Sequence, residues 1–151
     1  MISFELHGEP IGWQRTGIRI VTPKYGKQFA TIYTPAETRK YQAALALAAK
    51  VAMKGQKPLG GPLKLTVTAF MSVPRSWSNK KRDAALAGTV LPTGRPDVDN
   101  FIKQIDALKE IVWHDDAQVV DGRVIKLYDE HPRLRIEVAP IGTFGENVNE
   151  C

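Results

Sequence analysis

Residues 63–71 carry the pattern that most constrains the fold. Between Gly60-Gly61-Pro62 and Pro74, every second residue is apolar, at positions 63, 65, 67, 69 and 71. A period of two places these side chains on one face of an extended chain, so the pattern predicts a long strand with one face in the core. Residues 2–6 alternate in the same way, before a turn at Gly8-Glu9-Pro10. A sheet is therefore part of the fold.

The C-terminal part of the chain predicts two more strands. A β-rich run covers 119–127, and a second covers 134–139. Asp121-Gly122 inside the first run could form a two-residue hairpin turn. We favour a continuous strand with a bulge at that point, followed by a turn at residues 129–132.

Two other stretches have a helical period. Thr34-Pro35-Ala36-Glu37 combines a capping residue, a proline suited to the first helical position and a glutamate that completes a capping box. Apolar residues then recur at 41, 44, 45, 48, 51 and 52, which predicts a long amphipathic helix over 35–54. A shorter helix is predicted from Val98, with its apolar face at positions 98, 101, 102, 105 and 108.

Together these elements predict a mixed α/β (α+β) fold. A chain of 151 residues suits one domain. We expect a single compact domain over residues 1–140, with a sheet of about four mixed strands, one long helix and one shorter helix. Residues 141–151 have little to bury and are expected to form a loosely ordered tail. The alanine-rich stripe of the long helix permits packing on the sheet or across a subunit boundary.

The net charge of +5 is unevenly distributed. Residues 1–96 carry 15 basic and 4 acidic residues, whereas residues 97–151 carry 6 basic and 12 acidic ones. A basic first half favours a polyanionic partner such as nucleic acid. Carboxylates facing DNA would repel it unless divalent cations lie between them, so this combination is more typical of a metal-dependent nuclease than of a simple DNA-binding protein.

Other classes of protein are disfavoured. No stretch approaches the roughly 18 apolar residues that span a bilayer, and residues 2–6 form a strand pattern without a basic leader, so we expect a cytoplasmic protein without a membrane partner. The single cysteine, Cys151, excludes an internal disulfide and a thiolate metal site. A metal would be held by oxygen ligands or by the three scattered histidines.

Two basic segments are candidates for DNA contact. Residues 11–33 mix Arg15 and other basic residues with aromatic ones, which suits gripping a phosphate backbone and stacking on unpaired bases. The alternative is a solvated loop or ribbon whose aromatic residues anchor the core. The densest cluster, Lys80, Lys81 and Arg82, follows a capping Ser78 on a short polar helix. It binds DNA or forms a solvated face.

The chemically richest stretch starts with Arg95-Pro96-Asp97-Val98-Asp99-Asn100. If the backbone through Asp97 is extended, Asp97 and Asp99 point the same way. Helical spacing places Lys103 and Asp106 beside Asp99. A third carboxylate would come from Asp115 or Asp116, which point to opposite sides if extended. Carboxylates can hold Mg²⁺, which helps hydrolyse a phosphodiester by activating water and stabilising charge.

Each of these residues also has a structural explanation. Asp97 lies where aspartate commonly caps a helix. Asp99 could interact favourably with the positive N-terminal end of the helix dipole and pair with Lys103. Asp115 and Asp116 could be turn residues.

Three stretches resemble the RusA-type Holliday junction resolvases, a family common in prophages. They are Arg95 to Lys103, Asp106-Ala107-Leu108, and Val112-Trp113-His114-Asp115-Asp116-Ala117-Gln118-Val119-Val120. The resemblance implies a homodimeric, Mg²⁺-dependent endonuclease that makes paired symmetric nicks in four-way DNA junctions. We expect Mg²⁺ as the cofactor, with Mn²⁺ as an open alternative, and we expect no organic cofactor.

The resemblance also implies roles for individual residues. The metal-binding aspartates would be Asp97, Asp99 and Asp116, and the essential lysine would be Lys103. Apart from the resemblance, we expect Asp106, Asp115 and Asn100 to support these groups. From the basic segments we expect DNA contacts at Lys80, Lys81, Arg82, Arg15 and Arg95. Two alternatives stay open: a non-catalytic junction-binding or architectural DNA protein, and a metal nuclease with another structured nucleic-acid target.

Overall fold

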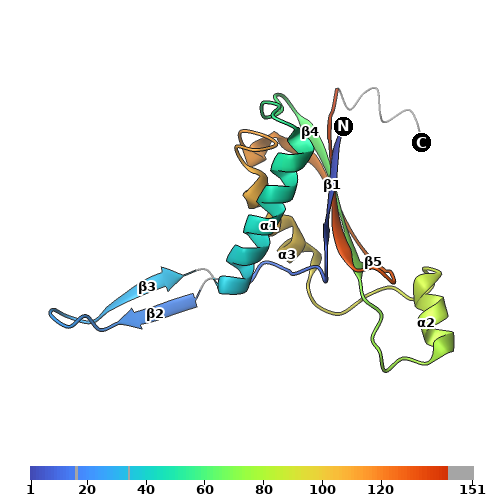
Figure 1. Ribbon diagram of the computed structural model, residues 1–151, viewed down its shortest axis with the longest axis horizontal. Helices are drawn as coiled ribbons and strands as arrows, with labels where there is room; N and C mark the ends of the chain where they lie inside the picture. Colours follow the sequence, from blue (N-terminus) through green and yellow to red (C-terminus); the bar gives the residue numbers. More distant parts are fainter. Residues whose placement is uncertain (16, 34, 143–151) are drawn as a thin grey trace.

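A four-stranded mixed sheet forms the centre of the protein in the computed structural model (Figure 1). The structure describes residues 1–15, 17–33 and 35–142. The order across the sheet is β1 (Ile2–His7), β6 (Arg133–Pro140), β4 (Leu63–Met71) and β5 (Val119–Tyr128). β4 runs parallel to β5, and the other neighbours are antiparallel. The predicted mixed sheet of about four strands is therefore confirmed.

The predicted alternation of β4 holds on the core side. Leu65, Val67 and Ala69 are fully buried, and α1 (Ala36–Met53) packs over this face with Leu45 and Ala49. On the opposite face Thr68 and Phe70 are also buried. The guanidinium carbon of Arg133 lies 3.9 Å from the centre of the Phe70 ring. Arginine side chains from β6 therefore help to cover this second face of β4 at Phe70.

The long helix is confirmed, with a shifted start. Pro35 has an extended backbone and is the residue before the first helical turn, so the prediction that it occupies the first helical position is wrong by one residue. Its carbonyl accepts the first helical hydrogen bond, from the backbone N–H of Arg39 at 3.1 Å. The predicted capping role of Thr34 falls outside the described residues. No helix in the described ranges is both long and apolar enough to cross a membrane.

β5 is a continuous strand, so the alternative of a hairpin at Asp121-Gly122 is wrong. Its register against β4 shifts between Leu63 and Lys64, which pair with Val119 and Asp121. The shift passes over Val120, so the predicted bulge is present but lies one residue before Asp121-Gly122. The chain turns after β5 and returns as β6, as expected, and the side chain of Arg133 pairs with Glu5 (2.9 Å) and Asp129 (3.3 Å). The predicted tail lies outside the described residues from 143 onward.

The basic segment near the N-terminus forms a separate two-stranded ribbon of β2 (Gly17–Val21) and β3 (Phe29–Tyr33). It projects away from the sheet and helices (Figure 1). Tyr25 is 84% exposed, Phe29 53% and Tyr33 40%. The alternative in which these aromatic residues anchor the core is therefore wrong for all three, because the ribbon extends beyond the layer that could cover them.

Two shorter α-helices follow β4, where the predicted fold had one shorter helix besides the long one. α2 (Asn79–Leu86) starts at Ser78, whose hydroxyl accepts a hydrogen bond from the backbone N–H of Lys81 at 3.3 Å, as predicted. α3 (Val98–Ile102) changes into a 3₁₀ helix over Lys103–Leu108. The expectation of one continuous apolar face therefore fails.

The tighter winding changes which side chains of this segment point inward. Phe101, Gln104 and Leu108 are fully buried, whereas Val98 is 50% exposed. A 3₁₀ helix has about three residues per turn, which brings Gln104 under Phe101. A polar residue at a core position could not be predicted from apolar periodicity.

Candidate active site

The loop that follows β1 lies against the start of α3. Gly12 is buried there, and a Cβ atom on it would be 2.5 Å from Cβ of Pro96. The backbone N–H of Trp13 donates to the carbonyl of Asn100 at 2.8 Å. The side-chain amide of Gln104 donates to the carbonyl of Ile11 at 2.9 Å. These contacts join segments that are more than 80 residues apart in the sequence.

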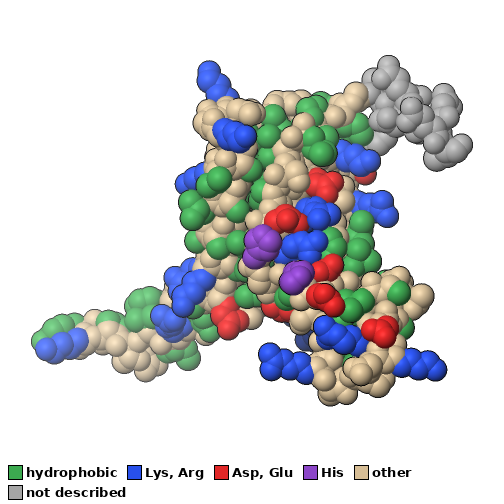
Figure 2. All heavy atoms as spheres, turned by 45° about the vertical axis from the view of Figure 1, so that its right-hand side comes forward, with side chains coloured by type: hydrophobic (Ala, Val, Ile, Leu, Met, Phe, Trp, Pro, Cys, Tyr) green, Lys and Arg blue, Asp and Glu red, His purple; other side chains and the backbone are tan. Residues whose placement is uncertain are grey.

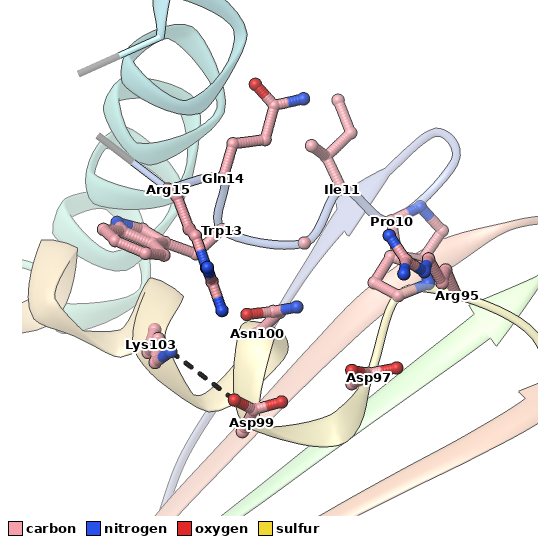
Figure 3. A pocket seen from close by; sticks show the side chains of 12 residues that line it. Pro10, Ile11, Trp13, Gln14, Arg15, Arg95, Asp97, Asp99, Asn100 and Lys103 are labelled. Carbon is pink, nitrogen blue, oxygen red and sulfur yellow. Dashed lines mark ion pairs between the residues drawn. The ribbon is translucent and has the colours of Figure 1, made fainter. Parts of the chain in front are cut away.

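A cavity of about 830 Å³ opens between this loop and α3 (Figure 3). Its charged and polar lining combines carboxylates at the start of α3 with basic groups from both segments: Asp97, Asp99, Asn100, Lys103, Arg15, Arg95 and Gln14. In Figure 3 Asp97 and Asp99 lie along one side of the cavity, and Arg15 extends toward Asn100. The structure thus brings together six of the residues that the sequence singled out.

Asp97 has the backbone conformation on which its predicted role depends. Its φ of −73° and ψ of 156° are extended, and α3 begins at the next residue. Within the described residues, the Asp97 side chain makes no capping hydrogen bond. The explanation of Asp97 as a helix cap therefore has no contact to support it, and its carboxylate faces the cavity that Asp99 also lines.

Lys103 is held by two neighbours on this surface. Its Nζ lies 3.4 Å from a carboxylate oxygen of Asp99, which confirms the predicted pairing one helical turn apart. It also lies 5.2 Å from the centre of the Trp13 ring, within cation–π range. Both charged side chains are about half exposed, so the ion pair adds little to stability. Its effect is to orient an ammonium group beside the carboxylates.

A second hollow of about 400 Å³ lies on the other side of Lys103. It is lined by Trp13, Ile102, Lys103, Ile105, Asp106 and Asp116. The indole N–H of the buried Trp113 donates to Oδ1 of Asp116 at 2.7 Å. That bond fixes one oxygen of the Asp116 carboxylate. Lys103 and Trp13 line both hollows. Asp106 and Asp116 therefore lie next to the cavity of Asp97 and Asp99, with Lys103 at the boundary between the two hollows.

Asp115 lies apart from both hollows and stabilises the local turn. Its Oδ1 accepts a hydrogen bond from the backbone N–H of Ala117 at 2.9 Å. The side-chain carbonyl of Gln118 accepts one from the backbone N–H of Asp115 at 3.0 Å, which completes a capping box. The amide of Gln118 also donates to the carbonyl of Leu59 at 2.9 Å, which ties this turn to the segment before β4.

The donor set fits a hard divalent cation. Asp97 and Asp99 present carboxylate oxygens to one cavity. Mg²⁺ prefers oxygen ligands and usually keeps several waters, so two carboxylates and a substrate phosphate can hold it. Among the described residues, no three acidic, histidine or cysteine side chains are close enough to form a complete site by themselves. Asp116 would have to complete the set from the neighbouring hollow.

The predicted DNA contacts fall in two places. Arg15 and Arg95 line the cavity. Lys80, Lys81 and Arg82 lie on α2, outside it, where Nζ of Lys81 lies 3.9 Å from the centre of the Trp77 ring. Blue basic side chains surround the part of the molecule at the lower right of Figure 2, where α2 lies. The basic residues of α2 therefore form a region separate from the basic residues of the cavity.

Comparison with known proteins identifies the family. The sequence model of the family described as Endodeoxyribonuclease RusA matches residues 8–139. This chain belongs to the RusA endodeoxyribonuclease family. It is 33% identical over 143 residues to the uncharacterized protein YqaN of Bacillus subtilis (strain 168), covering 93% of this chain and 96% of that one. It is 30% identical over 149 residues to a protein of Lactococcus phage r1t named crossover junction endodeoxyribonuclease rusA, covering 92% and 96%.

The RusA family match spans the ribbon and both segments that line the cavity. Sequence reasoning missed several residues that build the site of this RusA-family chain. Nothing in the sequence distinguishes Trp13 from the other aromatic residues of 11–33, although the centre of its ring lies 5.2 Å from Nζ of Lys103. Trp113 lies two residues before the acidic pair Asp115-Asp116, and this proximity is the one sequence feature that could have predicted its hydrogen bond to Asp116. Nothing local marked Gly12 or Gln104, because each acts on a distant segment.

Proposed function

We propose that this RusA-family protein is a Mg²⁺-dependent endodeoxyribonuclease that resolves four-way DNA junctions by paired symmetric nicks. The observation that carries the proposal is the shared cavity of Asp97, Asp99 and Lys103, with Arg15 and Arg95 at its edge. Carboxylates, an oriented lysine and arginines together suit the hydrolysis of a phosphodiester. The phage relative named as a crossover junction endodeoxyribonuclease supports branched DNA as the substrate.

Each residue has a distinct part in the proposed reaction. Asp97 and Asp99 would hold the divalent cation with Asp116, and Mn²⁺ could replace Mg²⁺ there. The bound cation would supply an activated water and charge stabilisation at the phosphate. Arg15 and Arg95 would bind the flanking phosphates. Lys103, already oriented by Asp99 and Trp13, would face the negative charge that develops as water attacks phosphorus and the bond from phosphorus to the deoxyribose oxygen breaks.

Two symmetric nicks require two equivalent sites. A two-fold homodimer provides them, because the same surface of each subunit then faces one half of the junction. We therefore propose that the active form is a homodimer. Asp106 lies beside Lys103 and would help to orient it, and Asn100 would position the loop through its backbone bond to Trp13. Asp115 would stabilise the turn that carries Asp116.

The test is a comparison of Asp99→Asn with wild type on four-way junction, duplex, flap and single-stranded DNA. We expect wild type to cut the junction in Mg²⁺ and to prefer it to the other substrates. Asp99→Asn should abolish cleavage and leave junction binding equal or tighter, because the substitution removes a negative charge that faces the DNA.

Glu130→Gln is the matched control, because it also removes one carboxylate but lies on the turn between β5 and β6, where it is exposed. It should cut normally. Asp99→Asn cleaving at the wild-type rate would contradict the nuclease mechanism and favour a junction-binding protein without catalysis. Preferential cutting of a flap or duplex by wild type would keep the nuclease but overturn the junction as its target.

A further inference from the structure

The ribbon of β2 and β3 carries exposed side chains that the proposed active site does not use. Every residue of both strands is described, and none is buried. Ile18, Ile20 and Ile32 are between 70% and 74% exposed. A two-stranded ribbon is at best marginally stable alone in water. Large exposed side chains on such a ribbon mark a surface that meets a partner.

The charge of this segment indicates the chemistry of that partner. Residues 11–33 contain Arg15, Arg19, Lys24 and Lys27 but no aspartate or glutamate, in a chain that has 16 acidic residues. The ribbon at the left of Figure 2 accordingly shows apolar and basic side chains along its projecting part. Basic groups without acidic neighbours gain most from a polyanion, because binding releases its condensed counterions.

One face of the ribbon is built as a flat stacking surface. Gly17 is opposite Tyr33 in the strand register, and a Cβ atom on Gly17 would lie 2.5 Å from the tyrosine ring. The Tyr33 ring therefore lies directly over the glycine. The guanidinium carbon of Arg19 is 4.8 Å from the centre of that ring. Arginine and aromatic planes in this arrangement are suited to stacking on nucleic-acid bases.

The turn at the end of the ribbon has the same character. Tyr25 is 84% exposed, and Nζ of Lys24 lies 5.9 Å from the centre of its ring. Lys27 is exposed two residues further on. An aromatic ring between two lysines can stack on a base while the lysines contact the adjacent phosphates.

The ribbon also continues directly from the proposed active site. Trp13 and Arg15, a few residues before β2, line the cavity. DNA bound at Asp97 and Asp99 would therefore lie close to the base of the ribbon. Strands in a ribbon are about 4.8 Å apart, and the major groove, about 12 Å wide, admits a two-stranded ribbon.

We propose that the β2–β3 ribbon is a DNA-binding arm. Lys24 and Lys27 bind phosphates, Tyr25 stacks on a base left unpaired at the branch point, and Arg19 on the Tyr33 ring offers a second stacking surface. This inference rests on the proposed function for the branched DNA that it engages. The competing occupant is a second protein chain covering the opposite face, where Ile18 pairs with Ile32.

The experiment measures binding of four-way junction and duplex DNA in EDTA across a range of salt concentrations. Lys24→Gln combined with Lys27→Gln should weaken binding to both DNAs and lower the slope of log affinity against log salt by about 2. Lys50→Gln combined with Lys54→Gln removes the same charge from the far end of α1 and should leave the slope unchanged.

Stacking is tested separately at Tyr25. Tyr25→Ala should weaken junction binding by roughly 5- to 150-fold, which is the usual range for one stacked base, and duplex binding much less. Tyr25→Phe keeps the ring and should bind as wild type. 2-Aminopurine at the branch point should be quenched by wild type and by Tyr25→Phe but not by Tyr25→Ala.

The outcomes separate this inference from the proposed function. If wild type cuts junctions while the lysine and tyrosine variants bind and cut equally well, the arm is overturned and the nuclease is kept. If Ile18→Thr combined with Ile32→Thr converts a dimer to a monomer while the arm variants keep their DNA affinity, the ribbon is a protein interface instead. If wild type binds no junction, the proposed function fails. The arm is then tested by whether the two lysine substitutions lower the slope of log affinity against log salt for duplex DNA.

Discussion

The approach of Gly12 to Pro96 can be tested by adding a single methyl group. In Gly12→Ala the new Cβ would lie 2.5 Å from Cβ and 3.0 Å from Cγ of Pro96, and 3.3 Å from Cβ of Asn100. Carbon atoms in good contact are about 3.5–4.0 Å apart. The proline ring cannot rotate away, so the loop must move by roughly 1 Å.

The expected cost follows from that displacement. Forcing an extra methyl group into a packed site typically costs about 1–3 kcal/mol of unfolding free energy. The shift also strains the hydrogen bond from Trp13 to Asn100, of 2.8 Å, and carries Trp13 away from Lys103. Misplacement of catalytic groups by about 1 Å can lower a rate by roughly 100-fold. We therefore expect a larger loss of junction cleavage than the modest loss of stability would explain.

The assays are urea unfolding and single-turnover cleavage of a four-way junction. Gly60→Ala is the matched control, because no heavy atom of the described residues outside its chain neighbours lies within 4 Å of its added Cβ. It should match wild type within about 0.5 kcal/mol and cut normally. If Gly12→Ala equals Gly60→Ala in both assays, the loop is not held against α3 in the way that the structure indicates.

Three further substitutions test other contacts. Trp13→Leu should lower the cleavage rate by about 2- to 5-fold through loss of the cation–π contact to Lys103, with KM unchanged and with rescue by Trp13→Phe; equal rates for the leucine and phenylalanine variants would contradict this. Trp113→Phe removes the N–H donor to Asp116 and should cost about 1.5–3 kcal/mol in urea unfolding; an unchanged midpoint would show that the bond is not formed. Hydrogen bonding by Arg133, helped by Arg135, holds the pKa of Glu5 below its usual range. The stability that this ion pairing gives is present at neutral pH and is lost as pH falls through the lowered pKa. Glu5→Gln should therefore be less stable than wild type by about 1 kcal/mol at pH 7, and below about pH 5 it should lose less unfolding free energy than wild type. Parallel curves of stability against pH for the two proteins would refute this.

Local periodicity was sufficient to predict most elements of the fold. The alternation of residues 63–71 depends only on near neighbours, and it produced β4 with its predicted bounds. The pairing of Asp99 with Lys103 was predictable for the same reason, because one turn of helix separates them. The capping role of Ser78 is similarly local.

Where a residue acts on a distant part of the chain, prediction stopped. The 3₁₀ segment after α3 buries Gln104, whose side-chain amide donates to the carbonyl of Ile11. No pattern in the sequence around position 104 predicts that partner. The choice between core anchor and exposed aromatic at Tyr25 also depended on where the ribbon lies relative to the sheet, and it lies beyond the core.

The candidate site shows the same division. The sequence by itself determined that Asp99 and Lys103 would be neighbours one helical turn apart, since backbone periodicity sets their spacing. The position of Asp97 depended on whether the backbone before the helix is extended, which the structure shows. Only the tertiary structure decided that Trp13 and Arg15 line the same cavity as these residues. It also decided that Asp116 lines the neighbouring hollow with Lys103, and that Asp115 stabilises a turn instead. Those positions depend on packing between segments far apart in the chain. The free energy of that packing cannot be read from any short stretch of sequence.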